Sequence, residues 1–202
     1  PLSSTVYDMN GKKVAELGGY KRTYISYKDV PKVLEDAVLA TEDARFYEHH
    51  GIDIVRLAGA VVANIQEGFG AEGGSTITQQ VVKMTFLSSK KTLERKAQEA
   101  WLALQLEQKY SKHEILEMYL NKIYYSDGIY GVARAAEYYF GKTNLKELTL
   151  PEAALLAGMP QSPNRYNPYD HPEAATKRRD TVLSLMVKHG FISQEEAEKA
   201  KQ

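Results

Sequence analysis

The chain contains no cysteine, which excludes disulfide bridges, thiolate metal sites and cysteine nucleophiles. It also lacks any long hydrophobic run, because the longest, at 57–63, is only a few residues and includes Gly59. A membrane span needs about 20 consecutive apolar residues, so none is expected within this sequence. Since no signal peptide opens the chain, we expect a piece cut from a longer protein.

A net charge is absent as well. Twenty-six basic residues balance twenty-six acidic ones, so no global field favours nucleic acid or an anionic membrane, and any anion site must be local. The chain has 202 residues, of which 43% are apolar, and this is enough for one substantial core. We therefore expect one domain and no nucleic-acid partner.

The hydrophobic pattern predicts a short β-hairpin followed by helices. The dipeptide Asn10-Gly11 suits a tight turn between strands at 5–9 and 12–17. Pro31 begins a helix that ends at or near Glu42. Apolar periodicity and three capping boxes predict seven further helices, at 54–65, 75–86, 92–109, 112–123, 150–158, 171–189 and 194–201. The prolines between 160 and 168 predict an extended connection.

The predicted helix at 75–86 carries a polar stripe. Its members fall at i, i+3, i+4 and i+7 and are Thr76, Gln79, Gln80 and Lys83. Ser75 supplies an N-cap, and free backbone N–H groups at such a helix start favour an anion. A solvated helix face accounts for the same stripe, so the segment alone indicates either an anion site or an ordinary surface.

The predicted helix at 92–109 has two apolar faces. The main one is expected to face the core and consists of Leu93, Ala97, Ala100, Trp101 and Leu104. Arg95 and Glu99 project from the other face, beside two leucines. They are either a surface i,i+4 ion pair or part of a cleft in which the cation keeps the carboxylate ionised.

Glu42 and Asp43 also allow two interpretations, a catalytic pair or an acidic surface pair near a helix end. His49 and His50 are either part of the same site or a plain helix stop. A zinc site is not expected, because the five histidines are scattered and lack the His-Glu-x-x-His spacing.

Four polar motifs follow one another along the chain. They are Glu42-Asp43-x-x-Phe46-x-x-His49-x-Gly51, Gly73-Gly74-Ser75-Thr76-Ile77-Thr78-Gln79-Gln80-x-x-Lys83, Arg95-Lys96-x-x-Glu99 and Ile115-Leu116-x-x-Tyr119-Leu120-Asn121. In this order they closely resemble glycosyltransferase family 51, the peptidoglycan glycosyltransferases of class A penicillin-binding proteins and monofunctional cell-wall polymerases. The resemblance extends through Pro160-x-x-Pro163-x-x-Tyr166-x-Pro168 and Arg178-Arg179-x-x-Val182-Leu183, and so covers nearly the whole chain.

The resemblance implies a mainly helical fold, with a lysozyme-like large lobe, a smaller membrane-facing jaw lobe and a cleft between them. Residues 1–28 would form the N-terminal hairpin and linker, and 29–202 the glycosyltransferase domain. The jaw lobe would lie at about 53–72, where apolar side chains such as Ile54 and Val61 dip into the lipid interface.

The reaction that the resemblance implies is the polymerisation of lipid II with inversion at the anomeric carbon. Glu42 would be the general base, and Lys83, Arg95 and Lys96 would neutralise the departing pyrophosphate. Glu99 would orient those cations or a divalent ion. The remaining candidates for substrate binding or for bracing the cleft are Asp43, Phe46, His49, Ser75, Thr76, Gln79, Gln80 and Asn121, with Tyr124 weaker.

The resemblance also implies partners. They are lipid II, the nascent glycan strand, the membrane interface and the inhibitor moenomycin, at the outer face of the bacterial cytoplasmic membrane. A membrane anchor before the domain and a transpeptidase domain after it are the expected missing parts. No cofactor is evident, apart from Mg²⁺ or Mn²⁺ at the pyrophosphate. A lytic enzyme on the same scaffold and a non-catalytic wall-binding module stay open as alternatives.

Overall fold

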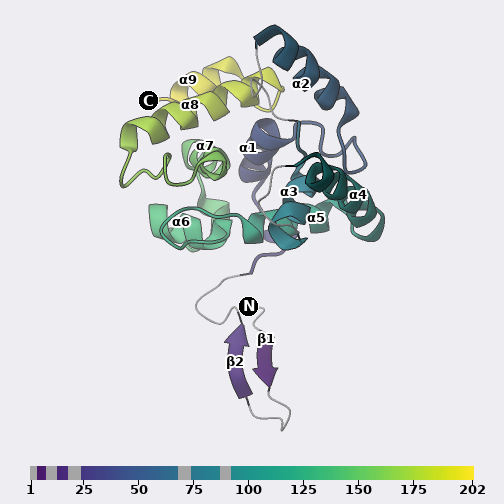
Figure 1. The fold of residues 1–202 in the computed structure, drawn as a ribbon. Coiled ribbons are helices and arrows are strands. Elements are labelled where there is room, and N and C mark those ends of the chain that lie inside the picture. The colour runs from purple at the N-terminus through teal and green to yellow at the C-terminus, as the bar shows by residue number, and fades with distance from the viewer. Residues whose placement is uncertain (1–3, 8–12, 18–23, 68–73, 87–91) are drawn as a thin grey trace.

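The structure is a computed structural model that describes residues 4–7, 13–17, 24–67, 74–86 and 92–202. As predicted, the described chain is mainly helical (Figure 1). Its α-helices are α1 Lys32–Glu42, α2 Ile54–Glu67, α3 Ile77–Phe86, α4 Leu93–Lys109, α5 Lys112–Lys122, α6 Val132–Phe140, α7 Leu150–Gly158, α8 Pro172–Lys188 and α9 Gln194–Ala200. Short 3-10 helices lie at Tyr27–Asp29, Leu145–Glu147 and Met159–Gln161.

Two strands, β1 Ser4–Tyr7 and β2 Lys13–Leu17, pair in antiparallel fashion near the N-terminus. The expected turn at Asn10-Gly11 lies outside the described residues, so the hairpin as a whole stays a prediction. Figure 1 draws the two strands apart from the helices that form the site discussed below.

The helix starts follow the local sequence closely. Ser111, Thr149 and Ser193 each form the capping box that the sequence predicts. The extended connection expected between 160 and 168 is wrong, because a 3-10 turn at Met159–Gln161 and a run of further turns occupy this stretch.

Helix α6 is missing from the sequence prediction. It is delimited by glycines with positive φ, 84° at Gly131 and 67° at Gly141, and its buried face is Val132, Ala135 and Ala136. The apolar residues of α6 have a clear helical period, but the helix has only nine residues and no side chain caps its start.

Helix α1 is the centre of the core. Every residue from Leu34 to Ala40 is buried, and the helix packs against α7 and α8, while α3 packs against α4 and α5 (Figure 1). Glu42, the last residue of α1, therefore lies where these two groups of helices meet.

The orientation of α4 differs from the prediction. Leu93 is 92% exposed and Trp101 is 62% exposed, whereas Glu99 and Ala103 are buried. The helix packs on α3 through the face that carries Glu99, so the apolar face expected in the core points outward.

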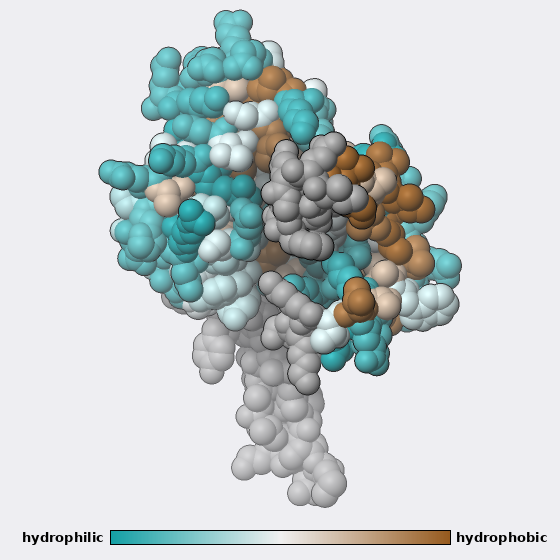
Figure 2. Space-filling view, turned by 45° about the horizontal axis from the view of Figure 1, so that its top comes forward, coloured by the Kyte–Doolittle hydropathy of each residue, from teal (hydrophilic) through white to brown (hydrophobic). Residues whose placement is uncertain are grey.

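Helix α2 exposes apolar side chains as well. Ile54, Val55, Val61 and Val62 are all at least half exposed, and Figure 2 shows hydrophobic surface gathered on this side of the molecule. None of the helices in the described ranges has both the length and the apolar content that a membrane span requires.

Candidate active site

The two motif glutamates line one cavity of about 510 Å³. Glu42 comes from the end of α1, and Glu99 from α4 across the cavity. The other polar residues in its wall are Ser75, Gln80, Lys83, Lys96, Tyr124 and Gln161. Residues as far apart in the sequence as Glu42 and Gln161 therefore line one polar cavity, together with both lysines of the motifs.

The Glu42 side chain is partly buried, and Gln80 Nε2 donates to its Oε2 at 3.3 Å. Burial is the main influence on this carboxyl and raises its pKa above the usual value. The Gln80 hydrogen bond and the charges of Arg178 and Arg56 act in the opposite direction. Glu42 is thus a carboxylate that holds a proton more readily than an ordinary surface glutamate.

Glu42 also lines a second cavity, of about 390 Å³. This cavity lies between the end of α1, the loop that leads to α2 and the last turns of α8, and Arg45, Arg56 and Lys188 are among its basic residues. Glu42 therefore contributes to the walls of two cavities.

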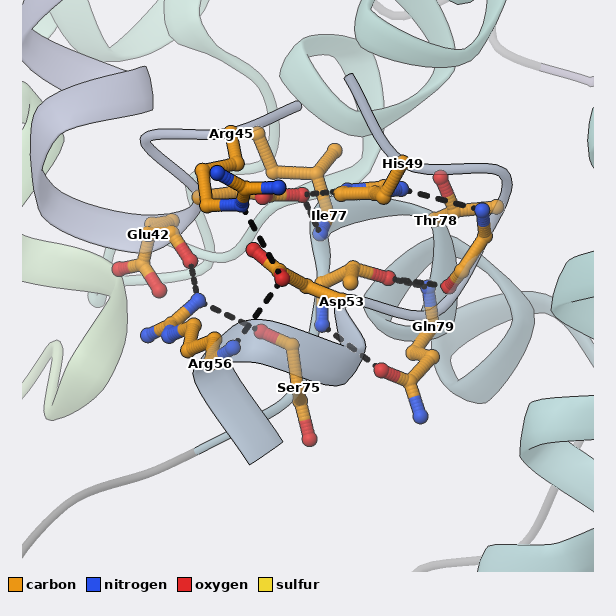
Figure 3. A network of polar contacts seen from close by, with 12 residues as sticks. Glu42, Arg45, His49, Asp53, Arg56, Ser75, Ile77, Thr78 and Gln79 are labelled. Atoms are coloured by element: carbon orange, nitrogen blue, oxygen red, sulfur yellow. Dashed lines mark hydrogen bonds and ion pairs between the residues drawn. The ribbon is translucent and has the colours of Figure 1, made fainter. Parts of the chain in front are cut away.

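A buried network fixes the loop after Glu42. Asp43, which is 1% exposed, accepts hydrogen bonds at Oδ2 from His49 Nε2 at 2.7 Å and from the backbone N–H of Ile77 at 3.0 Å. His49 Nδ1 in turn accepts from the backbone N–H of Gly51 at 3.0 Å. These contacts join the end of α1 to the first turn of α3, as Figure 3 shows.

Arg56 joins the same region from α2. Its guanidinium donates to the backbone carbonyls of Glu42 and of Ser75, the latter at 3.0 Å. Asp53 Oδ1 caps α2 by accepting from the backbone N–H of Arg56 at 3.1 Å, and it also pairs with Arg45. Figure 3 shows the Glu42 carboxyl turned away from these contacts, so the network holds the backbone and leaves the carboxyl available.

The start of α3 is held by a reciprocal cap. Thr76 N–H donates to Gln79 Oε1 at 2.9 Å, and Gln79 N–H donates to Thr76 Oγ1 at 3.0 Å. Both side chains are buried, as is Phe46. Of the predicted site residues, Asp43, Phe46, His49, Thr76 and Gln79 thus lie behind the cavity wall and brace it.

Lys96 connects the two motifs that face each other across the cavity. Its Nζ donates to Glu99 Oε1 at 2.9 Å and to Ser75 Oγ at 2.5 Å. Lys83 is exposed toward the same cavity. The two lysines and Ser75 therefore form a cationic and hydrogen-bonding part of the wall of the cavity that Glu42 also lines.

Two predicted residues lie elsewhere. Arg95 Nη1 donates to Gln98 at 3.2 Å, and Arg95 is not among the residues that line the cavity. Asn121 exchanges hydrogen bonds with the backbone N–H and C=O of Ile25, at 3.0 and 2.8 Å. Asn121 thus anchors the segment before α1 and does not face the cleft.

The sequence predicts no role for Arg56 or Arg178, although the positive charge of each lowers the pKa of Glu42. Arg178 lies in the motif Arg178-Arg179-x-x-Val182-Leu183, and this motif is the signal from which a role could have been predicted. Arg56 had no such signal except its place three residues after the capping Asp53.

A family model described as transglycosylase matches residues 10–187. Penicillin-binding protein 1A/1B of Bacillus subtilis (strain 168) is 63% identical over 201 residues, which cover 100% of this chain and 22% of that protein. Penicillin-binding protein 1A of Streptococcus oralis is 51% identical over 201 residues, which cover 98% of this chain and 31% of that protein.

Among solved structures, a 2.6 Å crystal structure of penicillin-binding protein 1A from Haemophilus influenzae matches 100% of this chain and 20% of its own chain. The sequence identity is 31% and the TM-score is 0.55. The chain therefore spans less than a third of the length of these relatives.

Proposed function

Because this chain belongs to the transglycosylase family, we propose that it is a peptidoglycan glycosyltransferase that polymerises lipid II into glycan strands. Lipid II is a disaccharide-peptide carried on undecaprenyl pyrophosphate. The sugar 4-hydroxyl of an incoming lipid II attacks the anomeric carbon of the growing strand, and the bond from that carbon to the pyrophosphate oxygen breaks with inversion.

One observation carries this proposal, namely that Glu42 lines the same cavity as Lys83 and Lys96. A glycosyl transfer from a lipid pyrophosphate needs a base for the attacking hydroxyl and cations for the leaving group. A hydrolase that acts on polymeric wall has a sugar as its leaving group and needs no cations for it. The shared cavity therefore favours transfer over hydrolysis.

Glu42 acts as the general base and takes the proton of the attacking hydroxyl. Burial raises the pKa of its carboxyl, and a base with a pKa nearer to the working pH accepts a proton more effectively. Gln80 orients this carboxyl through the hydrogen bond that its Nε2 donates to Glu42 Oε2.

The leaving pyrophosphate needs its charge neutralised more than it needs a proton. Lys83 and Lys96 supply that charge from the cavity that Glu42 also lines. Glu99 and Ser75 hold the Lys96 ammonium in place. Since Arg95 lies outside the cavity lining, we give it the weaker role of attracting the anion to the site.

A divalent cation, Mg²⁺ or Mn²⁺, does not fit a site made by protein alone. No three His, Cys, Asp or Glu side chains converge in the part of the chain that the structure describes. An ion here would be shared between the substrate phosphates and a single carboxylate such as Glu99, and no step of the reaction is routed through it.

The substrate is carried on a lipid, so the domain works at a membrane, which we take to be the outer face of the bacterial cytoplasmic membrane. The exposed apolar side chains of α2 would enter the lipid interface. We also assign the exposed Leu93 and Trp101 of α4 to the lipid interface, because tryptophan is favoured at the headgroup level. Residues 53–72, of which 68–72 lie outside the described residues, remain our proposal for the jaw lobe.

Two incubations test the function. With labelled lipid II the chain should yield long glycan strands, and moenomycin, which carries a phosphate, should stop their formation by competing at Lys83 and Lys96. With polymeric cell wall no fragments should appear. Release of short fragments from wall, with no polymer from lipid II, would show a lytic enzyme instead, and no product from either would favour a wall-binding module.

A further inference from the structure

A third polar cavity, of about 380 Å³, lies beside the cleft. It is bounded by the segment that follows α7, through Arg165 and Tyr166, and by the first half of α8, through Glu173, Lys177 and Arg178. None of the functions assigned above uses it.

The charge of this cavity is unbalanced. Arg165, Lys177 and Arg178 face a single acidic residue, Glu173. Within the described ranges, no carboxylate oxygen lies within 4.0 Å of a side-chain nitrogen of these three cations. The cavity therefore presents positive charge that the protein itself does not neutralise, which favours an anionic ligand.

The two guanidinium groups are held by the ring of Tyr166. The centre of the Arg165 guanidinium lies 5.6 Å from the ring centroid, and that of Arg178 lies 5.5 Å from it. Stacking on an aromatic ring leaves the N–H edges of a guanidinium open to a planar carboxylate. Arg178 is further fixed because its Nε donates to the carbonyl of Gly158 at 2.9 Å.

The cavity adjoins the reaction site. Arg178 lies near enough to Glu42 to influence the charge of its carboxyl, and Pro163, two residues before Arg165, lines the cleft cavity. A group that extends sideways from a sugar in the cleft would therefore meet Arg165 and Lys177.

We propose that this basic cavity, lined by Arg165, Lys177 and Arg178, binds a carboxylate of the peptide that the sugar substrate carries. The assignment rests on the proposed function, because that function supplies a peptide-bearing sugar. Glu173, at the same cavity, accepts a hydrogen bond from a peptide N–H or an amine, so the site favours a peptide with more carboxylates than amines.

The test compares two lipid II substrates in the Arg165→Gln/Lys177→Gln variant of this chain. One substrate has free peptide carboxylates, and in the other these are amidated. We expect the KM for the free-carboxylate substrate to rise about tenfold, as for the loss of one charge-assisted contact, with kcat unchanged. The KM for the amidated substrate should not change. Lys199→Gln, an exposed lysine on α9, is the matched control and should leave both values unchanged.

An equal rise in KM for both substrates would overturn the proposal, because the cavity would then not distinguish a carboxylate from its amide. A titration of the chain with the soluble peptide, followed by NMR, separates this result from a failure of the proposed function. Peptide binding that is lost in the variant supports the carboxylate site even if no polymer forms. Binding of inorganic pyrophosphate at these residues, with none of the peptide, would overturn it.

Discussion

The backbone N–H of Ile77 donates a hydrogen bond to Asp43 Oδ2 at 3.0 Å. This bond joins the residue after Glu42 to the first turn of α3, the helix that carries Gln80 and Lys83. The proposed base and the proposed cation are thus positioned relative to one another by a residue that lies behind both.

Asp43→Asn should lower the free energy of unfolding by about 2 kcal/mol, because a buried carboxylate that accepts two hydrogen bonds is replaced by an amide. Urea denaturation measures this loss. Asp170→Asn, at an exposed residue, is the control and should stay within about 0.5 kcal/mol of the parent chain. Equal stability of both variants would show that the network does not hold the site.

The polymerisation rate should fall as the pH is lowered, because the base must be ionised. Burial raises the pKa of Glu42 above the 4.5 of an ordinary glutamate, so the acid limb of kcat/KM should lie above that value. Gln80→Leu removes a hydrogen bond that lowers this pKa, so it should move the limb to still higher pH. Gln105→Leu, on the exposed side of α4, should not move it, and a limb that stays in place in Gln80→Leu would argue against Glu42 as the base.

Gly158→Ala should destabilise the chain by about 1–3 kcal/mol, the usual range for overpacking. A Cβ atom at this position would lie 2.8 Å from Arg178 Cγ and 3.0 Å from Val182 Cγ2. Thermal or urea unfolding checks the loss. The control is Gly59→Ala in α2, where a Cβ would meet nothing within 4 Å and where alanine should stabilise the helix by about 0.5–1 kcal/mol. A neutral Gly158→Ala would contradict the close packing of α7 on α8.

Leu93→Ser/Trp101→Ser should weaken binding to lipid vesicles several-fold while leaving the unfolding free energy nearly unchanged, because both side chains are exposed. Vesicle sedimentation and urea denaturation measure the two quantities. Tyr169→Ser removes an exposed aromatic residue from the segment between α7 and α8 and should leave vesicle binding intact. Unchanged binding of the double variant would exclude α4 from the interface.

The sequence predicted helix positions better than it predicted which helix face is buried. The starts at Ser111, Thr149 and Ser193 were predicted correctly, because a capping box is a local interaction. The outward face of α4 was predicted wrongly, because Leu93 and Trp101 have a helical period whether they meet a core or an apolar surface outside the protein.

The candidate site shows a similar limit. The motifs predicted one site that contains Glu42, Lys83, Lys96 and Glu99, and these four residues line one cavity. They did not distinguish residues that face this cavity from residues that support it, and Asp43, His49 and Gln79 are buried supports. That distinction depends on tertiary packing across α1, α3 and α5, which spacing along one chain does not encode.

The most direct test of the account is polymerisation of labelled lipid II by Glu42→Gln, measured together with lipid II binding and with stability. Because the pKa of Glu42 is raised in the folded state, the ionised carboxylate destabilises that state at neutral pH. The Glu42→Gln variant should therefore be at least as stable as the parent chain at neutral pH. This difference in stability should vanish below pH 4.5, where the carboxyl is protonated in both states. The account predicts a folded variant that binds lipid II and forms no polymer. Polymerisation at the parental rate would contradict it.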